Sequence, residues 1–475
     1  MSQGTFELFP APSNTLVKSL LPTPRIWPGA SPAAISRLRW ILEDNHIQHQ
    51  IFTNSLRFHN HTAHAALARW SLGADETILD ASYQRTASIA LPLFRSPQTI
   101  SKDNWKDHLA DTQYYHAYLA FFIEELKQKS FSEVLEEYLF ATSSNFAPLR
   151  GKQPQMLNRF LDGLMHPMIH VGHGLEFGLP GTVAEGLAMA AGHYALSTQL
   201  IPASLFSAEE LESDVAAQAH PSAKKVDAFT VFARIIGDRR FETPFGVEPP
   251  RLYASLMKRH GTLIKEYIDQ WDLEGNVVDK IEELMWIAVT IYGVGGYSSD
   301  AGFIPDFFFM HFVTSVIFLP SILAHLKLQS QLLLLRSYFS VCIGWYVWRR
   351  RPAINILHFY ESTEAANPLP HPLPRIRSDS SDSSPPPRAS TYNSWSSILG
   401  ASMTHSDDHL PKLQRTLNHC SELFGDRKAG YFSTSELKGA ELLDGTLFLR
   451  AAKLTATWME SLTENQPPWN RSWKL

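Results

Sequence analysis

The chain has 475 residues, of which 44% are hydrophobic and 12% aromatic, and its formal net charge is −5. This length allows one large or two medium domains with a sizeable core. The mild charge and the lack of a basic stripe give no reason to expect nucleic-acid binding. The only two cysteines, Cys342 and Cys420, exclude a disulfide framework and a cysteine-rich zinc site. Residues 1–12 show no secretory signal, so we expect a cytoplasmic protein.

Helical periodicity dominates the chain, whereas strands with hairpin turns are scarce. We therefore expect an all-α, mainly helical fold in a single large domain. Helices are predicted at Ala34–Asp44, Thr62–Leu72, Tyr114–Lys129, Phe131–Phe140, Val183–Leu200, Leu252–Asp272, Val277–Tyr292, His405–Cys420 and Thr446–Ser461. Gly73 stands at the usual glycine position after a helix.

One apolar run, Phe307–Leu326, is long enough to span a bilayer. Arg349-Arg350-Arg351 follows it, where a cytoplasmic anchor would lie. The run is interrupted by histidine, threonine, serine and proline, and polar residues are costly in lipid. We therefore expect a buried core helix and no membrane association.

Residues 361–397 differ from the rest of the chain. They contain Pro-rich stretches and a Ser/Asp run, which offer little to bury. We expect a flexible, disordered insertion between a helical catalytic core, residues 1–360, and C-terminal helices, residues 398–475, that pack back on it.

Twenty histidines are present, and two clusters of them stand out, His59–His64 and His166–His173. Imidazole is the commonest metal-binding side chain near neutral pH. His61 and His64, like His166 and His170, are spaced to share one helix face. Glu176 is placed to orient a ligand ring. The alternative interpretation is a capped helix with surface histidines in the first cluster and hydrogen-bonded core histidines in the second.

Two further segments add candidates. His311 lies in an aromatic stretch, where a lone histidine is usually a satisfied core residue. His409 and Lys412 are i,i+3 neighbours in a helix that Asp407 or Asp408 can cap. A buried neutral lysine can react with carbon dioxide to give a carbamate, which binds metal as a carboxylate does. The alternative for these residues is a solvated helix end.

Several common motifs are absent. The sequence has no His-Glu-x-x-His, no phosphate loop, no complete Gly-x-Gly-x-x-Gly and no Gly-x-Ser-x-Gly. A zinc protease and a serine hydrolase of that type are therefore not expected. No motif for binding a flavin or a nicotinamide is present either. A histidine-bound metal in a helical protein is the leading interpretation of the residues.

At these clusters the chain resembles the questin oxidase family of fungal secondary metabolism. The resembling segments occur in the family's order and cover most of the chain: Asn45-His46, Phe58-His59-Asn60-His61-Thr62-Ala63-His64, Leu72-Gly73-Ala74, His166-Pro167-Met168-Ile169-His170-Val171-Gly172 with Leu175-Glu176, Asp306–Ser315, and Asp407-Asp408-His409-Leu410-Pro411-Lys412. The resemblance implies an oxidoreductase that opens rings of anthraquinone-like aromatic polyketides, including mycotoxin intermediates, by Baeyer–Villiger-type oxidation. It also implies NADPH as reductant and, in a ring-cleaving branch, non-haem Fe(II).

The resemblance further implies which residues form the site. The metal ligands would come from His61, His166, His170, His311, His409 and a carboxylated Lys412. His64, Glu176 and Asp408 would orient them. The aromatic stretch Phe307–Phe312 could itself stack a flat polyketide, and we expect Phe308, Phe309 and Phe312 to bind the substrate. Five histidines and a lysine leave little room for dioxygen or substrate on an octahedral ion, so we expect at least one to lie outside the ligand set.

Our hypothesis is that the metal activates dioxygen and one oxygen atom is inserted beside a ring carbonyl, so that the ring opens through a lactone. One alternative is a metal-independent, NADPH-using oxidase whose histidines act as acid and base. Another is a non-enzymatic, membrane-associated helical binding protein. Loss of activity on adding chelator favours the metal enzyme over the first alternative, and recovery without detergent argues against the second.

Overall fold

The structure is a computed structural model that describes residues 6–15, 17–54, 57–146, 152–206, 225–242, 253–363, 394–463 and 466–472. The described residues are mainly helical, as expected. Their one sheet is a hairpin in which β1 (Tyr297–Ser298) pairs antiparallel with β2 (Gly302–Phe303). Residues 364–393, most of the expected insertion, lie outside the described part of the chain.

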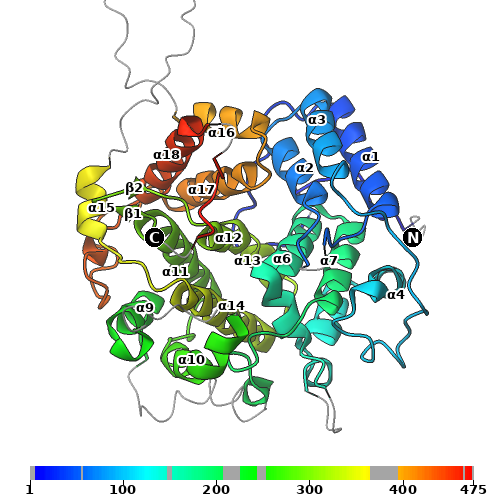
Figure 1. Cartoon of the computed structure of the whole chain (residues 1–475), viewed down its shortest axis with the longest axis horizontal. Coiled ribbons are helices and arrows are strands. Elements are labelled where there is room, and N and C mark those ends of the chain that lie inside the picture. Colours follow the sequence, from blue (N-terminus) through cyan, green and yellow to red (C-terminus); the bar gives the residue numbers. More distant parts are fainter. Residues whose placement is uncertain are drawn as a thin grey trace, which may run out of the picture.

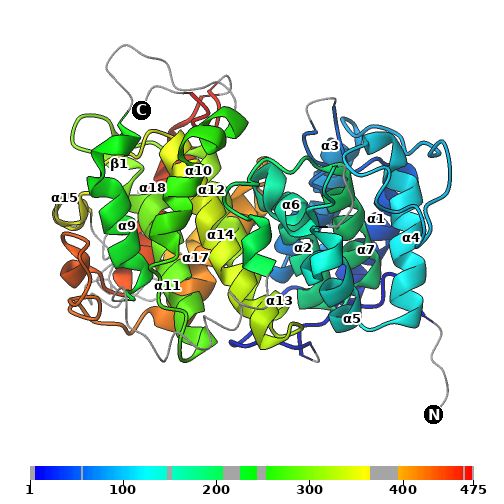
Figure 2. The ribbon, with the colours of Figure 1, turned by 90° about the horizontal axis from the view of Figure 1, so that it is seen from below.

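The helices form two halves that lie side by side (Figures 1 and 2). The first half is N-terminal and appears in blue and cyan. Its main helices are α1 (Pro32–Gln48), α2 (Thr62–Ser71), α3 (Glu76–Ala87), α4 (Tyr115–Gln128), α6 (Met156–Phe177) and α7 (Pro180–Gly192). Short turns of helix join them: η1 (Thr112–Tyr114), α5 (Phe131–Leu135), η2 (Glu136–Phe140) and η3 (Thr142–Ser144).

The second half runs from green to red (Figure 2). Its longer helices are α9 (Ala228–Gly237), α10 (Tyr253–Ile268), α11 (Val277–Val289), α12 (Phe307–Val316), α14 (Leu328–Trp348), α16 (Ser394–Thr404), α17 (Leu410–Phe424) and α18 (Thr446–Ser461). The shorter ones are η6 (Arg239–Phe241), η7 (Thr290–Val294), α13 (Leu319–Leu323), α15 (Ile356–Ser362) and η9 (Ala440–Leu442), whereas η4 (Ala203–Phe206) lies beside η3 of the first half. At the seam between the halves, α2 and α6 contact α17 and α12.

Most predicted helices are present, with shifted ends. The helix Thr446–Ser461 has the predicted bounds, and Gly73 follows α2 with φ +97°. The prediction Val183–Leu200 is wrong at its C-terminal end, because the chain turns extended at His193, directly after α7. The prediction His405–Cys420 begins too early, because the side chain of Asp407 caps α17 in the loop before it.

The apolar run Phe307–Leu326 forms two helices, α12 and α13, instead of one. The break precedes Pro320, which stands in the first turn of α13, where its missing N–H costs nothing. Both helices are largely buried in the protein core. Within the described residues, no helix is both long and apolar enough to cross a membrane.

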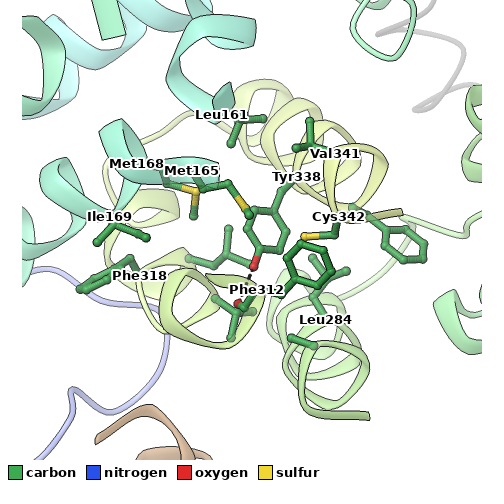
Figure 3. Packing of buried hydrophobic residues seen from close by; sticks show 14 of the residues in the cluster. Leu161, Met165, Met168, Ile169, Leu284, Phe312, Phe318, Tyr338, Val341 and Cys342 are labelled. Carbon is green, nitrogen blue, oxygen red and sulfur yellow. Dashed lines mark hydrogen bonds between the residues drawn. The ribbon is translucent and has the colours of Figure 1, made fainter. Parts of the chain in front are cut away.

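A single large hydrophobic cluster joins the two halves. Figure 3 shows Met165 and Met168 of α6 close to Phe312 of α12 and Tyr338 of α14. The Tyr338 hydroxyl donates to the Phe312 carbonyl at 3.0 Å, which satisfies a polar group in this core. Leu413 and Leu417 of α17 belong to the same cluster. The division of the chain into a core and returning C-terminal helices stays a prediction.

Candidate metal centre

Four histidines from four segments meet at the seam between the halves. His61 precedes α2, His166 lies in α6, His311 in α12 and His409 directly before α17. One ring nitrogen each of His166, His311 and His409 lies within 4.8 Å of the others, and all three side chains are buried. The rings of His59, His61 and His166 form a second such group. His166 belongs to both groups and so lies at the middle of the cluster.

A break in α6 aims the His166 ring. Gly163, Leu164 and Met165 all have positive φ angles, between +55° and +63°, so the helix stops and restarts at His166. Pro167 then falls in the first turn of the restarted helix, where proline is tolerated. The Gly163 carbonyl accepts a hydrogen bond from His166 Nδ1 at 2.6 Å. The proton is therefore on Nδ1, and Nε2 presents a bare lone pair to the cluster.

Gly163 also makes room for a pair of histidines. A Cβ atom at this position would lie 2.8 Å from His193 Nε2 and 3.1 Å from His59 Nε2. These two nitrogens are hydrogen-bonded to each other at 2.8 Å, and the His59 ring stacks on His166 at 3.8 Å. Only glycine fits this close approach and the left-handed backbone together.

His311 is held in the same way as His166. Its Nδ1 donates to the Phe307 carbonyl at 2.7 Å, and its buried Nε2 has no hydrogen-bond partner. Asp306 caps α12 by accepting from the N–H groups of Phe308 and Phe309. Asp306 itself forms a buried ion pair with Arg349 of α14. The start of α12, and with it His311, is therefore firmly positioned.

His409 and Lys412 are presented by the start of α17. Asp407 Oδ1 accepts from the N–H groups of His409 at 2.8 Å and Leu410 at 3.0 Å. Arg69 of α2, which is buried, donates to the carbonyls of His405 and Asp407 and ties this loop to the other half. Neither ring nitrogen of His409 has a hydrogen-bond partner among the described residues.

His61 is hydrogen-bonded to His166 through their two Nε2 atoms, 3.0 Å apart, with the rings 9° from coplanar. Because His166 carries its proton on Nδ1, His61 donates this bond. A metal ion bound by both Nε2 atoms would take the place of the shared proton.

Burial sets the charge state of these groups. It lowers the pKa of His61, His166, His311 and His409, and the nearby Lys412 lowers it further, whereas Asp407 partly offsets this at His409. Burial also lowers the pKa of Lys412 to about 8. Within the described chain, no hydrogen bond or ion pair reaches its Nζ atom. Neutral imidazoles with orphaned lone pairs, beside a readily deprotonated amine, are donors that fit a transition metal.

His170 faces a different set of partners. Its Nε2 bonds to Glu185 Oε2 at 2.7 Å and its Nδ1 to His64 Nε2 at 2.8 Å, so both ring nitrogens are engaged. The other Glu185 oxygen bonds to His46 Nδ1 at 2.7 Å. Burial raises the pKa of Glu185, but the hydrogen bonds from His170 and His46 outweigh burial and bring it to about 2. His170 and His64 thus belong to a buried series of hydrogen bonds beside the histidine cluster.

The remaining predicted residues have these positions. Glu176 pairs with Arg415 of α17 and not with a histidine. Asp408 lies 3.4 Å from Arg69. Phe309 and Phe312 are fully buried in the core, and Phe308 stacks on Trp345. The ring that contacts the cluster is Phe307, whose centroid lies 4.7 Å from that of His311 and 5.5 Å from that of His409.

Sequence reasoning missed Gly163, Glu185 and His193. Glu185 had a signal, since it is a lone carboxylate in an otherwise apolar, Ala-rich segment, and such a residue needs a buried partner. The pair Asp162-Gly163 inside a helical pattern is a turn signal. His193 carried no local signal, because its role depends on the approach of His59 from a distant segment.

The structure thus defines a helical protein with a buried histidine centre at the seam of its two halves. A family model described as questin oxidase-like matches residues 58–417, and the chain belongs to that family. It is an oxidoreductase, as the sequence resemblance implied.

Three relatives illustrate the similarity. The questin oxidase of Aspergillus terreus is 22% identical over 86% of this chain and 85% of its own length. The Baeyer-Villiger oxidase mdpL of Emericella nidulans is 26% identical over 90% and 89%. The Baeyer-Villiger monooxygenase AacuH of Aspergillus aculeatus is 32% identical over a shorter stretch, 35% and 34%.

Proposed function

We propose that this chain cleaves a ring of an anthraquinone-like aromatic polyketide by Baeyer–Villiger-type oxygen insertion, in fungal secondary metabolism. The observation that carries the proposal is the convergence of the His166, His311 and His409 nitrogens within 4.8 Å, two of them orphaned in the core. The names of the relatives, questin oxidase and Baeyer-Villiger oxidase, support the reaction class. Dioxygen as the oxidant, NADPH as the reductant and a cytoplasmic location belong to the same proposal.

The proposed metal is Fe(II). His61, His166, His311 and His409 would hold it, together with Lys412 as a carbamate. Bound there, iron supplies the activation of dioxygen. We leave His170 out of the ligand set, because Glu185 and His64 engage both of its ring nitrogens. This removes the crowding that five histidines would cause.

Lys412 suits carbamate formation for two reasons. The reaction needs a neutral amine, and burial lowers the pKa of Lys412 to about 8, so a substantial fraction is neutral near pH 7.5. The ammonium form also lacks a direct ion pair, so that its conversion to a metal-bound anion breaks no existing contact.

The protein's own groups prepare the site. The carbonyls of Gly163 and Phe307 hold the His166 and His311 rings in the tautomer that exposes Nε2. His59, His61 and Phe307 are only partly buried, and we propose that a substrate approaches from their side. The Phe307 ring offers an aromatic contact for a flat substrate beside the histidines.

The test combines metal analysis with turnover. We expect close to one iron per chain by plasma mass spectrometry, and chelator-sensitive turnover of an anthraquinone with NADPH. His166→Ala should lose both iron and turnover. His419→Ala is the matched control, since His419 is a buried histidine of α17 outside the cluster, and it should keep both. Full activity of His166→Ala would overturn the site, and activity in metal-free protein would favour the metal-independent alternative.

A further inference from the structure

The segment 466–472 runs along the start of α12, the helix that contains His311 (Figure 1). Asn470 pairs with this region through two backbone bonds, from its N–H to the Pro305 carbonyl and from the Phe307 N–H to its own carbonyl. Arg349, which pairs with Asp306, also donates to the Ser472 carbonyl at 2.7 Å. Backbone pairing on both sides fixes the segment in register with the site.

This register places two side chains near the histidines. Trp469 is buried, and its ring lies 6.2 Å from that of His409. Arg471 lies over the Phe307 ring, with its Cζ atom 4.0 Å from the centroid. The same Phe307 ring contacts His311 and His409. The Arg471 guanidinium is therefore one aromatic ring away from the centre, and it is accessible to solvent.

Within the described residues, no acidic group forms a direct ion pair with Arg471, although Asp407 lies close enough for its charge to favour the charged guanidinium. Each acidic group nearby already has a partner: Asp306 has Arg349, Asp408 has Arg69, Glu176 has Arg415, and Asp407 accepts backbone N–H groups. No ion pair or hydrogen bond of Arg471 occurs among the described residues. Partial burial lowers the pKa of Arg471, although the group stays charged. A guanidinium that no hydrogen bond or ion pair from the described residues engages can pair directly with an incoming anion.

We propose that Arg471 and Phe307 form an anion-binding subsite at the rim of the histidine centre, and that the substrate is an aromatic compound bearing a carboxylate or a phenolate. Phe307 contacts the ring, and Arg471 binds the anionic group with its fork of N–H donors. This inference rests on the proposed function, which it deepens by adding a charge to the substrate class.

The experiment uses two probes that differ in one charge, an anthraquinone carboxylic acid without phenolic hydroxyls and its methyl ester. Binding to the full-length protein is measured by quenching of tryptophan fluorescence. We expect the acid to bind the unmodified protein more tightly than the ester. Arg471→Gln should weaken binding of the acid about tenfold or more, the usual worth of a charge-assisted hydrogen bond, and leave the ester unchanged. Arg471→Lys should retain part of the preference for the acid.

Arg25→Gln is the matched control. Arg25 is also an exposed arginine resting on an aromatic ring, Trp27, but it lies near the other end of α2, where Trp27 pairs with Ser71. It should leave the binding of both probes unchanged. Equal affinity of Arg471→Gln and the unmodified protein for the acid would overturn the subsite. So would failure of the unmodified protein to bind either probe.

The binding measurement requires neither iron nor turnover. If the proposed oxidation failed but Arg471 still discriminated acid from ester, the subsite would stand on its own. If turnover were found without any such discrimination, the subsite alone would fall.

Discussion

The missing side chain of Gly163 leaves space for two histidines of the centre. A methyl group at this position would collide with His193 and crowd His59. We predict that Gly163→Ala lowers iron occupancy and costs about 1–3 kcal/mol from overpacking, in addition to the left-handed strain. Metal analysis and urea unfolding measure the two effects.

The variant Gly275→Ala separates the cost of a steric collision from the cost of backbone strain. Gly275 also has a positive φ, +85°, but a Cβ there would meet no atom within 4 Å. Gly275→Ala should cost about 1–2 kcal/mol from the left-handed backbone alone and keep its iron. Equal stability losses in the two variants, with iron retained in both, would show that the space beside His193 does not matter.

Lys412 makes the stability of the metal-free protein depend on pH. Its pKa is about 8 in the folded protein, against 10.5 for an unperturbed lysine, so the unfolded chain binds the proton more tightly. The cost of burying the ammonium is fully present below pH 8 and disappears as the pH rises towards 10.5.

We predict that Lys412→Met is more stable than the unmodified protein at pH 7, by on the order of 3 kcal/mol, and that this advantage shrinks to about 1 kcal/mol at pH 10. Urea unfolding in carbon-dioxide-free buffer measures it. The same advantage at both pH values would contradict the assigned burial of a charged amine.

Of the histidines that the resemblance implied, His61, His166, His311 and His409 lie together, and their role as metal ligands stays a prediction. His170 shares a helix face with His166 by spacing, yet its ring bonds to Glu185, because α7 brings a carboxylate to it. Periodicity gives the face of a helix but not the neighbour that approaches it. For the same reason, the aromatic residue at the centre, Phe307, could not be told from Phe308, Phe309 and Phe312.

At the scale of the element, the cap of α17 aims both His409 and Lys412. We predict that Asp407→Ala destabilises the protein by about 1 kcal/mol, the usual worth of an N-cap, and also reduces iron binding. Asp407→Asn keeps an accepting oxygen and should restore most of the stability. Thermal unfolding and metal analysis test both.

The cap of α9 serves as the comparison, because Asp227 accepts from the Thr230 N–H away from the histidines. Asp227→Ala should lose a similar stability and keep its iron. If both Ala variants kept full iron occupancy, the cap of α17 would have no part in positioning the ligands.

Helix ends show the same division between local and distant causes. The end of α2 before Gly73 follows from the local need for a left-handed residue. The end of α7 at Gly192 was not predictable, since His193 leaves the helix to meet His59 from another segment. The break in α6 at Asp162–Met165 likewise depends on what lies around it.

At the scale of the whole molecule, the proposed metal ligands come from both halves: His61, before α2, and His166 of α6 on one side, and His311 of α12 and His409, before α17, on the other. Bound metal should therefore stabilise the fold as one unit. We predict that iron at 100 times its dissociation constant stabilises the protein by about 2.7 kcal/mol, which raises the melting temperature. Scanning calorimetry with and without chelator measures the shift, and His166→Ala should show none. An unchanged melting temperature in protein that demonstrably binds iron would contradict a metal that bridges the halves.

The arrangement of the four central histidines also fixes an order of events during synthesis. His61 leaves the ribosome early, and His166 follows about a hundred residues later. The other two central histidines, His311 and His409, emerge only after most of the chain has been made. In the proposed metal centre, an incomplete chain therefore carries only pairs of the ligands, and the complete set is present only when α17 docks against α2. We expect metal binding to be a late step of folding, so that a cell short of iron accumulates full-length, metal-free chains.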